Sequence, residues 1–211
     1  MPLHGFSWAT EWTPKKIEVD EATLELKSSE TSLGLYPFHF LITMKLKLNA
    51  NSLRIDVTIK HERPASKHAN AMPVAIGWHP YLALSKISNS ISISSDVNYP
   101  VTPQGDAGKP IPTAEHLGTG PWPLPKKELE SLIFSKLTAC PSILKKANQP
   151  DLLISSGPPE VMNHVVTWTN SPSEFFCVEP WMSLPNAVSA PAGCRWLKAD
   201  ESLAVWIEIT G

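Results

Sequence analysis

The stretch FHFLITMKLKLNANSLRIDVTIK, residues 38–60, decides the fold class of this chain of 211 residues. Its apolar side chains occupy every second position, in two runs: Phe38, Phe40, Ile42, Met44, Leu46 and Leu48, and then Leu53, Ile55, Val57 and Ile59. This alternation is typical of strands that bury one face. Turn-forming residues 49–52 separate the runs, so the sequence predicts an antiparallel hairpin.

Shorter segments of the same kind recur along the chain. Residues 17–27 indicate two strand pieces whose alternation slips at Asp20 and Glu21, which predicts a bulge or a turn. Pro125 precedes the best helix candidate, residues 126–132, and residues 105–125 are rich in proline and glycine, which predicts a long loop. The remaining strands are predicted at 72–78, 88–94, 97–101, 152–155, 164–169, 175–179 and 203–210. Many short strands without long helices predict an all-β antiparallel β-sandwich in one domain, residues 1–211.

The composition indicates a globular protein and argues against two classes of partner. Hydrophobic residues make up 42 % of the chain, charged residues 18 %, and the net charge is −2. This balance gives no electrostatic drive toward nucleic acid or an anionic membrane. The three cysteines have no metal-ligand spacing, which favours reduced thiols and a cytoplasmic location. Tryptophan, present eight times, often packs against sugar rings while offering an N–H donor.

Two polar groups, His79 and Glu179, each come between an apolar run and a proline, in Gly77-Trp78-His79-Pro80-Tyr81 and Cys177-Val178-Glu179-Pro180-Trp181. A carboxyl group at the end of a buried strand is partly desolvated, which raises its pKa and makes it a better base near neutral pH. A histidine can supply a proton in the same range. The alternative interpretations are a solvated strand-end glutamate and a structural histidine.

These segments resemble the aldose 1-epimerase (galactose mutarotase-like) family, in order and in type. His4-Gly5-Phe6 looks like the His-Gly motif of that family, and residues 77–81 look like its Gly-x-His-Pro-Tyr segment. Residues 177–181, followed by Pro185-Asn186-Ala187, are similar to its C-terminal base motif. The resemblance implies a galactose mutarotase-like supersandwich that is short at its N-terminus, because members have several strands before the His-Gly motif.

The resemblance also implies roles for single residues. His79 would be the general acid at the ring oxygen of a cyclic aldose, and Glu179 the general base at the anomeric hydroxyl, with neither metal nor cofactor. The implied substrate is a hexose or a hexose phosphate, and the implied activity is that of an isomerase in carbohydrate metabolism. The residues implied to bind the sugar are His4, Trp8, Trp78, Tyr81, Glu130 and Trp181.

Two departures from the family pattern keep other functions open. Trp8 stands where sugar-phosphate members often have a basic residue, and Glu130 stands near the place of a sugar-binding aspartate. The alternatives are a non-catalytic carbohydrate-binding or regulatory protein on the same scaffold, and a structural or interaction domain. A short N-terminus would leave a sheet edge exposed, which makes a homo-oligomer an expectation as well.

Overall fold

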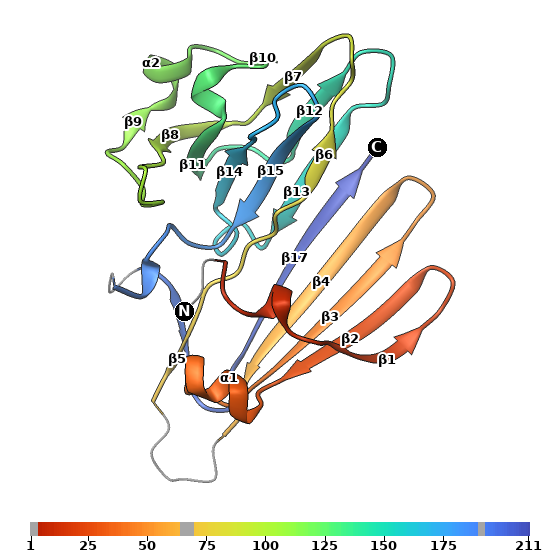
Figure 1. Ribbon diagram of the computed structural model, residues 1–211, viewed down its shortest axis with the longest axis vertical. Coiled ribbons are helices and arrows are strands. Elements are labelled where there is room, and N and C mark those ends of the chain that lie inside the picture. The colour runs from red at the N-terminus through yellow and green to blue at the C-terminus, as the bar shows by residue number, and fades with distance from the viewer. Residues whose placement is uncertain (1–3, 64–69, 190–192) are drawn as a thin grey trace. The chain divides into compact units, whose positions relative to one another are not determined.

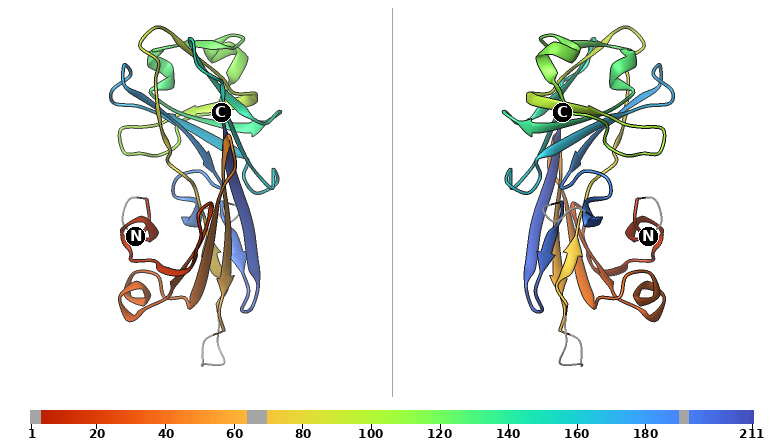
Figure 2. Two further views of the ribbon diagram at one scale, coloured as in Figure 1. Left: turned by 90° about the vertical axis from the view of Figure 1, so that its right-hand side faces the viewer. Right: turned by 90° about the vertical axis from the view of Figure 1, so that its left-hand side faces the viewer.

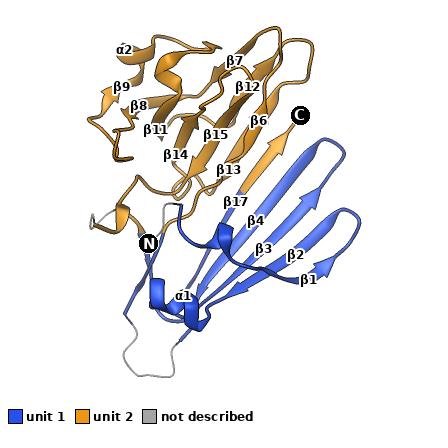
Figure 3. Ribbon diagram, viewed as in Figure 1, with its two compact units in different colours: residues 1–74, 195–206 blue, residues 75–194, 207–211 orange. Residues whose placement is uncertain are grey.

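The computed structural model describes residues 4–63, 70–189 and 193–211. Its strands are antiparallel, and its two α-helices are short. The chain divides into two compact units, which Figure 3 colours separately. Unit 1 comprises residues 1–74 and 195–206, and unit 2 comprises residues 75–194 and 207–211. The all-β antiparallel architecture predicted from the sequence is confirmed.

Unit 1 is built on the predicted hairpin. β3 (Phe40–Leu48) pairs with β4 (Ser52–His61) from Phe40↔His61 to Leu48↔Leu53. The slip at Asp20 is a turn, because β1 (Thr13–Ile17) and β2 (Glu21–Lys27) form a second hairpin whose turn the Glu18 N–H closes on the Glu21 carbonyl. The unit also holds β5 (Met72–Val74), β16 (Arg195–Leu197) and part of β17 (Ser202–Thr210), a strand that both units share.

An aromatic cluster anchors the N-terminal segment to the unit 1 sheet. The Phe6 ring lies 5.8 Å from Tyr36 and 5.6 Å from Phe40. Tyr36 follows helix α1 (Glu30–Leu35), which begins in a capping box of Ser29 and Ser32. Figure 2 shows α1 and the short 3-10 helix η1 (Ser7–Ala9) on the same side of this sheet. Phe6 of the His4-Gly5-Phe6 segment therefore packs against the sheet of unit 1.

Unit 2 contains a six-stranded sheet and part of a second sheet (Figure 1). The order of the six-stranded sheet is β6 (Tyr81–Ala83), β15 (Phe175–Trp181), β14 (His164–Trp168), β11 (Ser131–Leu137), β8 (Ser95–Pro100) and β9 (Ile111–Pro112). The second sheet contributes β13 (Leu152–Gly157), β12 (Ser142–Lys146), β7 (Asn89–Ser92) and β10 (Trp122–Leu124). Both sheets supply fully buried side chains to the core, among them Phe134, Phe176 and Val178 from the first and Ile91, Leu144 and Ile154 from the second.

The helix predicted at residues 126–132 is wrong. A single 3-10 turn, η2 (Lys127–Leu129), is separated from β11 by one residue, Glu130. The run Leu132, Ile133 and Phe134 is buried on both faces between β8 and β14. Such a strand shows no alternation, so its pairing and not its local pattern decides its structure.

Two further predictions need correction. The predicted loop at residues 105–125 contains β9, helix α2 (Thr113–Leu117) and β10. The predicted strand at residues 72–78 is a strand only over β5, which pairs with β16, and beyond it the segment meets β15 at one isolated bridge, Gly77↔Trp181. In the described part of the chain, every helix is too short or too polar to cross a membrane.

Candidate active site

Strand β15 carries the predicted base. Alternation places Phe175, Cys177, Glu179 and Trp181 on one face of the strand, and Phe176 and Val178 on the opposite face, in the core. The ladder with β14 runs through Val166↔Glu179 to His164↔Trp181, so the strand continues two residues beyond its predicted end. The backbone is therefore paired with β14 both before and after Glu179 along the strand.

The segment before β6 brings the predicted acid to the same place. The Trp78 N–H donates to the Pro180 carbonyl at 3.2 Å, and the Met182 N–H donates to the Ile76 carbonyl at 2.9 Å. Between these bonds Gly77 lies directly against the Trp181 ring, where a Cβ would come within 2.6 Å of the indole Cδ1. Only glycine lets the segment run this close to β15, and His79 follows two residues later.

His79 and Glu179 are in contact. His79 Nε2 lies 3.4 Å from Glu179 Oε1, with the glutamate side chain 2 % exposed and the histidine side chain 31 % exposed. The Trp181 indole N–H donates to the other carboxyl oxygen, Oε2, at 3.2 Å. The acid and base predicted from distant segments therefore form one buried pair with one side toward solvent.

Burial dominates the electrostatics of this pair. It raises the pKa of Glu179 from 4.5 to about 8, and the hydrogen bond from Trp181 acts in the opposite direction. Burial, together with the charge of Glu179, raises the pKa of the Cys177 thiol to about 12. Near neutral pH the carboxyl group thus exchanges its proton readily, which is the property a general base requires.

Aromatic rings surround the exposed side of His79. Tyr81 stacks on the imidazole with ring centres 5.0 Å apart and an interplanar angle of 14°. Trp168 meets the imidazole edge-on at 5.5 Å, and Phe175 contacts both Tyr81 and Trp168. Tyr81 is 60 % exposed, so these rings offer apolar surface of the kind on which sugar rings stack.

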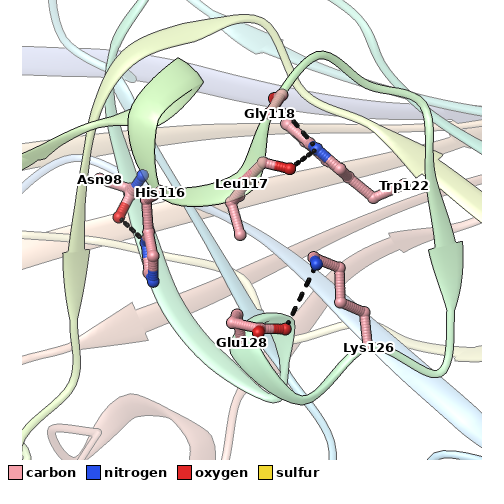
Figure 4. Close-up of polar contacts among 7 residues, drawn as sticks. All are labelled: Asn98, His116, Leu117, Gly118, Trp122, Lys126 and Glu128. Atoms are coloured by element: carbon pink, nitrogen blue, oxygen red, sulfur yellow. Dashed lines mark hydrogen bonds and ion pairs between the residues drawn. The ribbon is translucent and has the colours of Figure 1, made fainter.

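Trp168 also borders an open hollow of about 400 Å³. Two ion pairs lie at its rim, Lys127 with Glu130 at 2.5 Å and Lys126 with Glu128 at 3.4 Å. His116 Nδ1 lies 2.7 Å from Asn98 Oδ1, which orients the imidazole that lines the hollow (Figure 4). Glu130, predicted to bind sugar, thus lines a hollow that shares Trp168 with the acid–base pair.

The other residues predicted to bind sugar fall into two groups, those beside the acid–base pair and those in the other unit. Trp181 contacts Glu179 directly, and Trp78 is tied to β15 through its backbone. His4, with a φ of 63°, and Trp8, which is 72 % exposed, belong to unit 1, whereas the pair belongs to unit 2. A role of His4 and Trp8 in sugar binding therefore stays a prediction.

Sequence reasoning missed three residues beside the pair: Trp168, Phe175 and Cys177. All three lie in strands that the sequence predicted, but the register Trp168↔Cys177 exists only in the folded sheet. The position of Cys177 two residues before Glu179 was an available signal, because residues i and i+2 of a strand share a face.

Comparisons with known proteins agree with this architecture. The sequence model of the aldose 1-epimerase family matches residues 1–124, a range that includes His79 and ends before Glu179. A comparison with curated proteins finds no match.

Solved structures similar to this chain come from several organisms. A galactose mutarotase-like protein from Lactobacillus casei ATCC 334 has a TM-score of 0.81 at 16 % identity, covering 100 % of this chain and 76 % of its own. An aldose 1-epimerase candidate from Escherichia coli K12 has a TM-score of 0.80 at 21 % identity, and the match covers 99 % of this chain and 70 % of the E. coli chain. A GalM/aldose epimerase homologue from C. elegans has a TM-score of 0.73 at 13 % identity, and the match covers 95 % of this chain and 68 % of the C. elegans chain. At these identities the similarity shows the fold.

Proposed function

The chain belongs to the aldose 1-epimerase family, and from this premise we propose that it interconverts the α and β anomers of a hexose. The observation that carries the proposal is the 3.4 Å contact between His79 Nε2 and the buried carboxyl of Glu179. In a cyclic hexose the anomeric hydroxyl and the ring oxygen are bonded to the same carbon. An acid and a base must therefore be neighbours to act on both.

The pair carries one proton at each stage of the reaction, on His79 before the ring opens and on Glu179 after it has opened. The Glu179 carboxylate takes the proton of the anomeric hydroxyl while protonated His79 gives its proton to the ring oxygen. The bond between the anomeric carbon and the ring oxygen breaks, and the open aldehyde rotates. Neutral Glu179 then returns its proton to the carbonyl oxygen while His79 recovers one from the hydroxyl, which closes the ring as the other anomer. Each such transfer is typically worth ~10²–10⁴-fold in rate.

The charges around the hollow favour a neutral hexose over a hexose phosphate. Lys126 and Lys127 are each paired with a glutamate, Glu128 and Glu130. A phosphate group would have to displace these carboxylates, whereas sugar hydroxyls can bond to either partner. With Trp168 and Tyr81 as stacking surface, this side-chain set fits an uncharged polyhydroxylated ring.

Polarimetry of freshly dissolved α-glucose and α-galactose tests the proposal. The protein should speed the approach to the equilibrium rotation, and Glu179→Gln should abolish the effect while Glu174→Gln, at an exposed carboxylate near the start of β15, retains it. Sugar-dependent quenching of tryptophan fluorescence without any change in rate would instead support the non-catalytic carbohydrate-binding alternative. Equal activity of Glu179→Gln and the unmodified protein would refute the assigned base.

A further inference from the structure

The acid–base pair has a third neighbour that the proposed reaction does not use. One ligand-type atom from each of His79, Cys177 and Glu179 lies within 4.8 Å of the other two. Cys177 is fully buried on the same face of β15 as Glu179. The Cys177 thiol therefore places a sulfur atom beside the acid–base pair.

We propose that His79, Cys177 and Glu179 form an inhibitory binding site for a thiophilic divalent cation such as Zn²⁺. Zn²⁺ in proteins takes nitrogen, sulfur and carboxylate ligands at about 2.0–2.3 Å, which places neighbouring ligand atoms roughly 3–4 Å apart. The His79 and Glu179 atoms, at 3.4 Å, already have that separation. The Cys177 sulfur lies within 4.8 Å of both atoms, so binding would require it to close the remaining gap.

The chemistry of the three ligands selects the cation. Imidazole and thiolate favour Zn²⁺ and similar ions over Mg²⁺ and Ca²⁺, which prefer all-oxygen sites. When the ion binds, the Cys177 thiol and any neutral Glu179 carboxyl each release a proton to solvent. The thiolate and the carboxylate then neutralise the charge of the ion, so no net charge is buried. His79 is the most exposed of the three ligands, with 31 % of its side chain exposed.

Occupancy would stop the proposed reaction. The His79 nitrogen and the Glu179 oxygen would both be bonded to metal, and neither could exchange a proton with the sugar. The inhibition rests on the proposed function, but the binding does not, and the two can be measured separately.

Co²⁺ is the probe for binding, because a cobalt–thiolate bond gives a charge-transfer absorption band in the near ultraviolet. One equivalent of Co²⁺ should produce the band, and Zn²⁺ should remove it. Cys177→Ser should lose the band and bind Zn²⁺ at least ~100-fold more weakly, since loss of even an outer-shell partner costs 10–100-fold. Cys140→Ser, which removes an exposed thiol, is the matched control and should keep both signals.

A second variant guards against misfolding of Cys177→Ser. His79→Gln removes a ligand whose side chain is partly exposed, and it should weaken Zn²⁺ binding while the circular dichroism spectrum is retained. Absence of the band in the unmodified protein, or its persistence in Cys177→Ser, would overturn the metal site whatever the protein does to sugars. Zn²⁺ bound at one equivalent with no loss of anomer exchange, measured relative to each protein's own metal-free rate, would overturn the inhibition.

Discussion

Replacing Glu179 by glutamine should stabilise the protein while abolishing its proposed activity. The pKa of the buried carboxyl is about 8, against 4.5 for an ordinary glutamate. The folded chain therefore keeps this proton at pH values where the unfolded chain has lost it. It follows that this group lowers the free energy of unfolding as pH rises from 4.5 to about 8, and adds no further change above that range.

The size of the effect follows from the same two pKa values. At about 1.4 kcal/mol per pKa unit, the whole difference is worth about 5 kcal/mol, and about 4 kcal/mol of it falls between pH 5 and pH 9. Glutamine has a similar volume, stays neutral, and can still accept the indole hydrogen bond from Trp181 and face His79. The variant should thus match the unmodified protein within about 1 kcal/mol at pH 5 and exceed it by about 4 kcal/mol at pH 9.

Urea unfolding followed by tryptophan fluorescence at pH 5, 7 and 9 measures this difference. His79 and Cys177, which face the same carboxyl, are present in both proteins, so the difference reports the titration of Glu179 together with its coupling to these two neighbours. Glu174→Gln, at an exposed position, should show no pH-dependent gain. A stability difference between Glu179→Gln and the unmodified protein that stays constant from pH 5 to pH 9 would refute the claim that burial holds this carboxyl neutral.

Three further variants probe the groups around the pair. Trp181→Phe removes the hydrogen bond to Glu179, which favours the carboxylate; because a bond to a charged group is worth about 1.5–3 kcal/mol, the pH–rate profile should move up by about one pH unit or more, and an unmoved profile would exclude this role. Gly77→Ala forces a Cβ to within 2.6 Å of the Trp181 ring, so its pH–rate profile should move in the same direction. If the profile shifts of Gly77→Ala and Trp181→Phe simply added in the double variant of both, Gly77 would act elsewhere than through Trp181. Trp168→Leu removes the ring that contacts His79 and borders the hollow; KM should rise about 5-fold with kcat within about 2-fold, as expected when stacking binds the substrate and its transition state equally, and a fall in kcat alone would contradict that role.

The sequence reveals strands best where one face is buried. The hairpin of β3 and β4 was predictable because apolar and polar residues alternate along it and a turn separates the two runs. β11 was not predictable in this way, since both of its faces are buried and its apolar run carries no period. It begins at Ser131, two residues after η2, whose sequence locally favours a helix, and pairing with β8 and β14 overrides that preference.

For the candidate site, the sequence identified groups but not their distances. His79 and Glu179 were recognisable by the prolines that follow them, yet they are a hundred positions apart. The backbone bonds of residues 76–78 to β15 bring them within 3.4 Å. Trp168 carries no local signal of a site, because its place beside the pair comes from the cross-strand register Trp168↔Cys177.

Anomer exchange at equilibrium, measured by exchange NMR on glucose, tests whether the imidazole and the carboxyl work as one proton-sharing unit. The proteins to compare are the unmodified chain, His79→Asn, Glu179→Gln and the double variant. Each single variant should lose at least ~10²-fold in rate. The double variant should lose little more, because the reaction needs both side chains and either substitution alone already stops the proton exchange. Losses that multiply in the double variant, or exchange that survives either single substitution, would contradict a shared proton between these two side chains.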